Sequence, residues 1–150
     1  MIKHLSYSKI EKYIYIGTNI CCRKHFNELL NIGISADIDL EEEKMDRPST
    51  GITVFLWLPV IDFQAPSQIK LHIAAHVIDT LVLHKQKCYI HCHQGLGRAP
   101  TVVAAYYVLK GMTVKQALDK IKKIRPSAKP NNKQVNALNI FAKNISLYRK

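Results

Sequence analysis

The stretch HCHQGLGRAPT (His91–Thr101) lies between two apolar segments of different character. The run before it, KCYIH (residues 87–91), has the length and composition of a short buried strand. The run after it, from Ala99 to Lys110, predicts an apolar helix that ends at Gly111. A strand, a glycine loop and a helix in this order direct backbone N–H groups and the positive helix end at one point. The stretch therefore predicts a cradle for a tetrahedral anion.

The residues within this loop supply a nucleophile and a grip on phosphate. Arg98 follows Cys92 by six positions, with Gly95 and Gly97 between them. A guanidinium binds phosphate oxygens in a planar, two-pronged way. The helix end and the arginine also stabilise the thiolate form of Cys92. A thiolate beneath a bound phosphoryl group is an in-line nucleophile that forms a cysteinyl-phosphate.

Other interpretations of the loop are weaker. A Walker-type loop needs Gly-Lys-Ser/Thr after its glycines, whereas this chain has Gly-Arg-Ala. A zinc site built on His91, Cys92 and His93 lacks a second ligand pair at suitable spacing. A lone cysteine at a strand end is usually a small core residue. The histidine before Cys92, and the two glycines and the arginine after it, disfavour that interpretation here. We therefore expect neither a metal nor a cofactor.

The rest of the chain alternates between strand-like and helix-like segments. Strands are expected at 13–17, 34–40, 52–58 and 87–91. Helices are expected at 22–31, 67–84, 99–110 and 113–124, followed by a last one that carries Leu138, Ile140 and Phe141. This order predicts one α/β domain over residues 1–150, with a mostly parallel sheet of four to five strands and helices on both faces.

Composition narrows the class of protein. The chain has 150 residues, 47% of them hydrophobic, and a formal charge of +11, which favours anionic partners. No apolar run approaches the ~18 residues that span a bilayer, and the N-terminus lacks the apolar core of a signal peptide. We therefore expect a cytoplasmic protein that does not bind membranes. Its cysteines are expected to be reduced thiols: Cys21, Cys22, Cys88 and Cys92.

The loop resembles the signature of the cysteine-based protein tyrosine phosphatase superfamily, HCxxGxxR followed by Ser or Thr. The segments KIEKYIYIGTN and GISADIDLEEE are similar to the opening of compact dual-specificity phosphatases, and LPVIDFQAPS to small archaeal-type members. The resemblance implies their fold, with Cys92 as nucleophile, Arg98 as phosphate ligand and His91 as support for the thiolate. It also implies that the substrate phosphate is surrounded by His93, Gln94, Gly95, Leu96, Gly97 and Arg98.

Two further catalytic residues are implied by the same resemblance. The family takes its general acid from an aspartate about thirty residues before the cysteine, and Asp62 holds that place in a proline-bounded loop. Asp37 and Asp39 are competitors, but they lie in a strand-like run and favour a structural role. Gln134 resembles the glutamine that orients the hydrolytic water, although it also suits a capping box with Asn131.

Ala99 departs from the family pattern, because most relatives have a hydroxyl there that helps the thiolate leave. Thr101 is expected to point away, since residues two apart on a helix do not share a face. Pro100 suits a first helical turn. The string GLGRAP is also similar to the loop of plant glucan phosphatases, which share Ala-Pro at this place. The alanine is therefore compatible with turnover and raises the alternative of a phosphoglucan substrate.

These observations predict a dual-specificity protein phosphatase that acts as a monomer on phosphorylated proteins. The alternatives are the same chemistry on a phosphoglucan, a phosphoinositide or an RNA 5′-triphosphate, and a phosphate-binding pseudophosphatase. Lysines typical of phosphoinositide-type relatives are absent at His93 and Gln94, which disfavours a lipid. The positive charge leaves nucleic acid open without favouring it.

Several other residues carry weaker expectations. Trp57 is expected in the core, whereas Phe63 suits either the rim of the pocket or a structural position. His72 and His76 have the spacing of a metal pair, but surface or half-buried positions are favoured. The basic run Lys120, Lys122, Lys123 and Arg125 favours a solvated helix face over an anion-docking patch. Cys88 favours a buried strand position over a protective disulfide.

Overall fold

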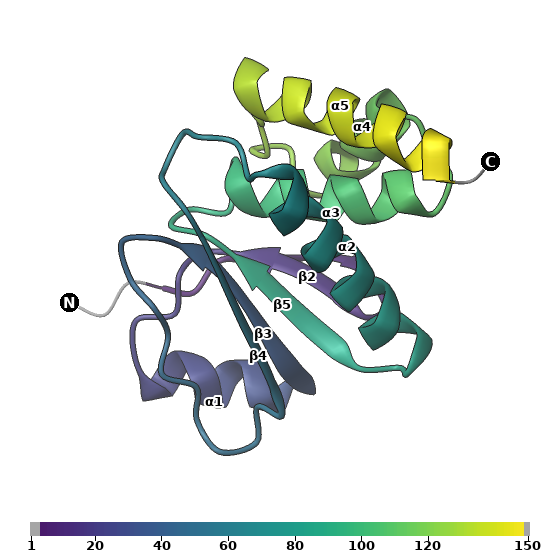
Figure 1. The fold of residues 1–150 in the computed structure, drawn as a ribbon. Coiled ribbons are helices and arrows are strands. Elements are labelled where there is room, and N and C mark those ends of the chain that lie inside the picture. The colour runs from purple at the N-terminus through teal and green to yellow at the C-terminus, as the bar shows by residue number, and fades with distance from the viewer. Residues whose placement is uncertain (1–3, 149–150) are drawn as a thin grey trace.

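A five-stranded sheet organises the structure, a computed structural model that describes residues 4–148 (Figure 1). Its strands are β1 (Tyr7–Glu11), β2 (Ile14–Gly17), β3 (Ile34–Glu41), β4 (Val54–Val60) and β5 (Lys87–His91). Their order across the sheet is β1-β2-β5-β3-β4. The strands β2, β5, β3 and β4 run parallel, and β1 pairs with β2 in the antiparallel sense.

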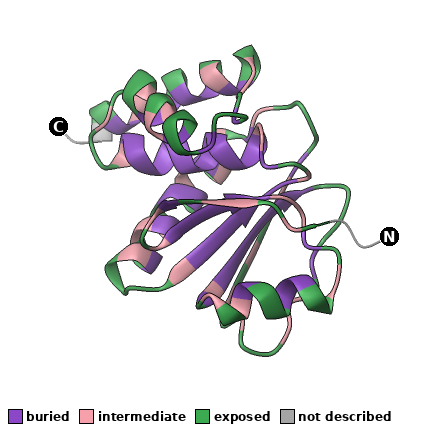
Figure 2. Cartoon of the chain, turned by 180° about the vertical axis from the view of Figure 1, so that it is seen from behind, coloured by how far each residue is buried: buried purple, intermediate pink, exposed green. Residues whose placement is uncertain are grey.

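Helices cover both faces of this sheet, as the alternating pattern predicts. Helix α1 (Arg23–Asn31) packs on one face, against β3. The other face carries α2 (Gln68–Leu83), α3 (Arg98–Leu109), α4 (Val114–Ile124) and α5 (Asn132–Tyr148). Helix α3 lies at the centre of this layer and is buried along almost its whole length (Figure 2). The predicted fold class, a mostly parallel α/β sheet with helices on both faces, is confirmed.

Strand residues alternate between two apolar layers. On β3 and β5, Ala36, Ile38, Cys88 and Ile90 join the large cluster beneath α2–α5. A smaller cluster under α1 contains Tyr15, Phe26, Leu29 and Tyr89, among others. Because side chains alternate along a strand, the residues between these positions face the α1 side of the sheet.

The structure differs from the sequence-based expectation at both edges of the sheet. Strand β1 was not anticipated, because YSKIE has only one buried side chain, Ile10. Strand β4 runs from Val54 to Val60 and includes Pro59, which an edge strand tolerates because its outer side needs no N–H. The prediction that Trp57 lies in the core is wrong: the side chain is 39% exposed, and its indole N–H donates to the Glu41 carbonyl at 2.7 Å.

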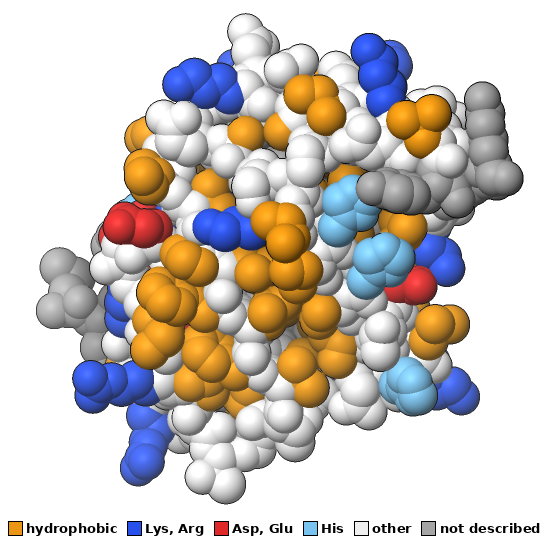
Figure 3. All heavy atoms as spheres, viewed as in Figure 1, with side chains coloured by type: hydrophobic (Ala, Val, Ile, Leu, Met, Phe, Trp, Pro, Cys, Tyr) orange, Lys and Arg blue, Asp and Glu red, His pale blue; other side chains and the backbone are white. Residues whose placement is uncertain are grey.

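The edge at β4 leaves an apolar surface. Phe55 and Trp57 on β4 and Ile69 and Ile73 on α2 are all at least 38% exposed. Hydrophobic side chains gather over this part of the molecule in Figure 3. Within the described residues, no helix combines the length and the apolar character that crossing a bilayer requires.

A group of buried polar residues interrupts the layer beneath α1. Asp37, Asp39 and Glu41 occupy alternate positions of β3 and are at most 1% exposed. His91, the last residue of β5, lies among them with its Nε2 atom 3.0 Å from Asp37 Oδ1 and 2.7 Å from Asp46 Oδ2. Asp39 accepts the backbone N–H groups of Glu41 and Asp46, both at 2.9 Å. We call these five residues, Asp37, Asp39, Glu41, Asp46 and His91, the acid–histidine cluster.

Four members of the acid–histidine cluster bind a proton more tightly than they would in water, whereas burial of Asp46 is outweighed by its hydrogen bonds with His91 and Asp37, which lower its pKa. Burial raises the pKa of Asp37 to about 8, a change that the hydrogen bond with His91 only partly offsets. Burial likewise raises the pKa of Asp39 to about 6 and that of Glu41 to about 7. Burial disfavours the charged form of His91, but its hydrogen bonds to Asp37 and Asp46 hold its pKa well above the ordinary value. An imidazolium that joins two carboxyl groups, at least one of them protonated, satisfies these contacts.

Stability should therefore depend on pH through Asp37. Its folded-state pKa is raised, so its contribution to stability is complete below the unfolded value near 4 and is lost as pH rises toward 8. We expect Asp37→Asn, which cannot ionise, to reduce the loss of unfolding free energy between pH 6 and pH 8 by roughly 2 kcal/mol. Urea unfolding of wild type and variant at both pH values measures this difference.

The comparison between the two proteins cancels the titration of groups that do not contact Asp37. Asp119→Asn is the matched control, because Asp119 is exposed on α4 and pairs with Lys115. Equal pH slopes for wild type and Asp37→Asn would contradict the protonated state of Asp37.

Candidate active site

A cavity of about 460 Å³ lies where the parallel strands end, the usual position of ligand sites in α/β sheets. The residues that the sequence singled out gather around it. Those that line it are Asp62, Cys92, His93, Gln94, Leu96, Gly97, Arg98 and Gln134. Phe63 also lines this cavity and is 71% exposed, so it lies at the rim rather than in the core.

The loop between β5 and α3 is fastened through its carbonyl groups. The carbonyls of His93 and Leu96 accept the N–H groups of Asn19 at 3.1 Å and Lys129 at 2.7 Å. The carbonyls of Gln94 and Gly95 accept Nη2 and Nε of Arg125, at 3.0 and 2.9 Å. In a trans peptide the N–H points opposite to the preceding C=O. The N–H groups of residues 94–97 therefore point away from the donors that bind these carbonyls. This is the orientation that an anion cradle requires.

Arg125, like Glu43, is a residue of this site that the sequence did not identify. It follows α4, is only 5% exposed, and also donates to Ser8 Oγ on β1 at 3.0 Å. The prediction that the whole basic run forms a solvated helix face is wrong for Arg125, although Lys122 and Lys123 are exposed. An arginine beside a proline, immediately after an amphipathic helix, was the available signal.

Two glycines of the loop are required for different reasons. Gly95 has φ of +69°, and a Cβ there would come within 2.7 Å of the Gly17 carbonyl oxygen and 2.9 Å of Arg125 Nη2. A Cβ at Gly97 would lie 3.0 Å from Gln134 Oε1. The loop thus packs against β2 on one side and α5 on the other, with no room for side chains at these points.

The guanidinium of Arg98 is buried and held by acidic and carbonyl oxygens. Its Nη1 and Nη2 atoms donate to the two carboxylate oxygens of Glu43 at 2.7 and 3.0 Å, and Nη1 also reaches the Val60 carbonyl at 2.8 Å. Asp62 Oδ1 lies 3.3 Å from Nη2. The hydrogen bond from Arg98 lowers the pKa of Glu43. The Nε donor of Arg98 is buried and has no hydrogen-bond partner among the described residues.

Asp62 is placed beside both the cavity and Arg98. It is about half exposed, and its Oδ1 also accepts the N–H of Phe63 at 3.0 Å. Phe63 has φ of +65°, an uncommon conformation for a bulky residue. Its carbonyl accepts a hydrogen bond from Asn131 Nδ2 at 2.8 Å. The loop that carries the carboxyl group is thus tied to the start of α5.

Cys92 and its neighbours form the base of the cavity. Cys92 is 3% exposed, while the His91 ring turns away into the acid–histidine cluster, so any support it gives to the thiolate is indirect. Ala99 is fully buried. Thr101 donates its hydroxyl hydrogen to the Gly97 carbonyl at 2.7 Å.

Gln134 completes the capping box that the sequence predicts. Its side-chain Oε1 accepts the backbone N–H of Asn131 at 2.9 Å, and its backbone N–H donates to Asn131 Oδ1 at 3.0 Å. Its Nε2 donates to the Gln64 carbonyl at 3.1 Å, on the loop that follows Asp62. The side chain therefore links α5 to that loop while it also lines the cavity, and its part in orienting water stays a prediction.

The remaining candidates fall outside the cavity. Cys88 is fully buried, donates to the Tyr13 carbonyl, and has its pKa raised to about 12 by burial, so the strand position is confirmed. His72 is half-buried against Phe141, and His76 is exposed, as expected. Asp37 and Asp39 belong to the acid–histidine cluster, which confirms their structural role.

Solved structures of known proteins share this fold closely. PTPMT1 in complex with PI(5)P superposes with a TM-score of 0.85 at 23% identity, over 96% of this chain and 99% of that one. Tk-PTP in its active form gives a TM-score of 0.81 at 26% identity, over 92% and 97% of the two chains. At 23% identity, the likeness to PTPMT1 supports the fold alone.

Sequence comparisons point to the same family. Phosphatidylglycerophosphate phosphatase PTPMT2 of Arabidopsis thaliana is 31% identical over 127 residues, which cover 80% of this chain and 55% of the relative. Human dual specificity protein phosphatase 5 is 29% identical over 82% of this chain and 32% of its own length. The chain thus spans about half or less of these relatives. The family model for the dual specificity phosphatase catalytic domain matches residues 14–144, and the chain belongs to this family.

Proposed function

We propose that the protein hydrolyses phosphate monoesters through a cysteinyl-phosphate and acts as a dual-specificity protein phosphatase. The observation that carries the chemistry is the meeting of Cys92, Arg98 and Asp62 around one cavity. A nucleophile, a phosphate ligand and an acid are the three functions that transfer of a phosphoryl group requires.

The first step transfers the phosphoryl group to sulfur. The Cys92 thiolate attacks phosphorus while the amides of residues 94–97 and Arg98 hold the equatorial oxygens. Asp62, in its protonated form, gives its proton to the leaving oxygen as the phosphorus–oxygen bond breaks. Its distance of 3.3 Å from Arg98 supports this role, because the leaving group must depart beside the bound phosphate.

The second step releases phosphate. Asp62, now a carboxylate, takes a proton from a water molecule that attacks phosphorus, and the phosphorus–sulfur bond breaks to regenerate the thiolate. Ala99 has no hydroxyl to assist that thiolate, so this step is the slower one. The Glu43 carboxylate keeps Arg98 in place through both steps.

Phosphorylated proteins are the proposed substrates because the chain resembles compact dual-specificity members over most of its length. A second candidate is a phosphorylated lipid headgroup. The relative PTPMT2 is named for phosphatidylglycerophosphate. In this chain Ile61 and Phe63 next to Asp62 are 61% and 71% exposed, and Lys129 lines the cavity. Exposed apolar side chains beside a cationic one suit a lipid surface.

Removal of the nucleophile tests the chemistry. Turnover of p-nitrophenyl phosphate in the presence of a chelator should fall by at least about 10³-fold in Cys92→Ser. The substitution is close to isosteric, so the circular dichroism spectrum and melting temperature should remain those of the wild type. Rapid-quench mass spectrometry of the wild type should reveal a phosphoryl adduct on Cys92. Undiminished activity in the variant would rule out Cys92 as nucleophile.

Substitution of the acid tests the assignment of Asp62. We expect Asp62→Asn to lower kcat/KM, which reports the first step, on a phosphotyrosine peptide by about 10²-fold, since a general acid contributes on that order. The loss should be smaller on p-nitrophenyl phosphate, whose leaving group departs without protonation. Asp119→Asn serves as the control for a lost carboxylate elsewhere. Equal losses on both substrates would move the acid to another residue.

A substrate panel tests the proposed specificity. Phosphotyrosine and phosphothreonine peptides should both be dephosphorylated, with kcat/KM higher than for phosphatidylglycerophosphate in mixed micelles, for a phosphoglucan or for an RNA 5′-triphosphate. Phosphate release by pure protein at matched substrate concentration measures this order. A preference for the phospholipid that Phe63→Ser abolishes would replace the protein substrate by the lipid.

A further inference from the structure

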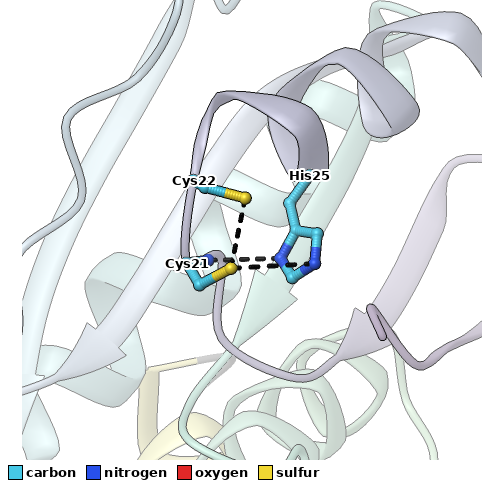
Figure 4. A group of neighbouring side chains, drawn as sticks. All are labelled: Cys21, Cys22 and His25. Atoms are coloured by element: carbon cyan, nitrogen blue, oxygen red, sulfur yellow. Dashed lines mark hydrogen bonds between the residues drawn. The ribbon is translucent and has the colours of Figure 1, made fainter. Parts of the chain in front are cut away.

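Two adjacent cysteines lie outside the cavity that carries the proposed chemistry. Cys21 and Cys22 follow β2, and Cys22 is the N-cap residue of α1. Cys21 is exposed, Cys22 is partly exposed, and His25 in the first turn of α1 is buried beside them. Figure 4 shows the three side chains turned toward one another.

The two sulfur atoms are close enough to interact directly. Cys21 Sγ and Cys22 Sγ are 3.2 Å apart, with the Cys21 thiol as donor and Cys22 as acceptor. His25 Nδ1 accepts the backbone N–H of Cys21 at 3.2 Å. A neutral imidazole with Nδ1 as acceptor carries its proton on Nε2. That atom lies 3.8 Å from Cys21 Sγ and can donate toward the sulfur.

The same contacts divide the two thiols into a nucleophile and its partner. The backbone N–H of His25 and the thiol of Cys21 lower the pKa of Cys22. The hydrogen bond with Cys22 raises the pKa of Cys21. Position at a helix N-terminus favours a thiolate, and thiolates rather than thiols react with electrophiles. Cys22 is therefore the sulfur that attacks an electrophile first, and Cys21 is the sulfur that then attacks Cys22.

Small molecules have access to this pair. A cavity of about 590 Å³ is lined by both cysteines together with Arg23, Lys44 and Arg47. The nearby charge of Lys24 adds to the lowering of the Cys22 pKa. By contrast, Cys88 is fully buried with a pKa raised to about 12, and Cys92 opens into the other cavity.

We propose that Cys21 and Cys22 form a peroxide-reactive dithiol that is converted to a vicinal disulfide. The Cys22 thiolate attacks one oxygen of a hydroperoxide, whose oxygen–oxygen bond breaks to give a sulfenic acid and an alkoxide or hydroxide. That leaving oxygen takes up the proton that the Cys22 thiol had released and departs as an alcohol or water. Cys21 then attacks the sulfenic sulfur, and its proton leaves with the hydroxyl group as water. The two thiols are oxidised by two electrons, and one hydroperoxide is reduced.

The product is readily reversed by thiols. Adjacent Cα atoms lie ~3.8 Å apart across a trans peptide, which is shorter than the roughly 4.4–6.8 Å that disulfides prefer. Strain of this kind makes a disulfide easier to reduce and is typical of labile rather than structural bonds. The pair is thus a reversible modification site and not a cross-link that holds the fold.

Peptide mass spectrometry tests this proposal without any measurement of phosphatase activity. Trypsin cuts after Lys12 and Arg23, so the peptide from Tyr13 to Arg23 contains both cysteines. In the Cys92→Ser background, brief treatment with hydrogen peroxide should make this peptide lighter by two hydrogens. Dithiothreitol should restore its mass. A peptide that keeps both thiols, or a dimer linked through Cys21, would overturn the proposal.

Single substitutions assign the two sulfurs. In Cys21→Ser the sulfenic acid has no partner, so dimedone should label Cys22. In Cys22→Ser the remaining Cys21 should stay reduced at the same peroxide dose. Equal dimedone labelling of Cys21 and Cys22 in these two variants would show that no attacking thiol is selected, and would contradict the mechanism.

Discussion

The site depends on one constraint. The carbonyl groups of the loop between β5 and α3 point outward and are held there by hydrogen bonds. Four consecutive carbonyl groups, those of residues 93–96, accept donors from three separate parts of the chain. Asn19 follows β2, Arg125 ends α4, and Lys129 precedes α5. A short glycine loop has little rigidity of its own. Its N–H groups point inward only because the rest of the fold binds the carbonyl group of each peptide on the outside. The binding geometry is thus a property of the whole domain.

The buried polar layer beneath α1 serves the same site from the opposite direction. His91 precedes Cys92 and joins Asp37 to Asp46, and Asp39 binds the backbone at both ends of the segment 41–46. That segment carries Glu43, whose carboxylate holds the guanidinium of Arg98. Charged groups are costly to bury unless they are paired. Here the pairing links the residue before Cys92 to the partner of Arg98.

Much of this arrangement was predictable from the sequence because it is local in the chain. The strand, loop and helix around Cys92 and the capping boxes at Thr113 and Asn131 follow from short patterns, whereas the interpretation of Asp62 came from the resemblance to the phosphatase family. What could not be predicted depends on distant partners. Arg125 lies in a basic run and looks like a surface residue until β1 and the loop enclose it. Likewise DIDLE alternates as a half-exposed strand would, and only the position of His91 on β5 explains why its acids are buried.

Strand β4 has a consequence for how the protein behaves at high concentration. As an edge strand with the sequence VFLWLPV, it presents unpaired backbone groups beside exposed aromatic side chains, which favours β-pairing between copies and aggregation. Pro59 interrupts the row of donors, because it has no N–H to offer a neighbouring strand. The charge of +11 makes copies repel one another over about 10 Å at moderate salt. Colloidal stability of this domain therefore depends on one proline and on ionic strength.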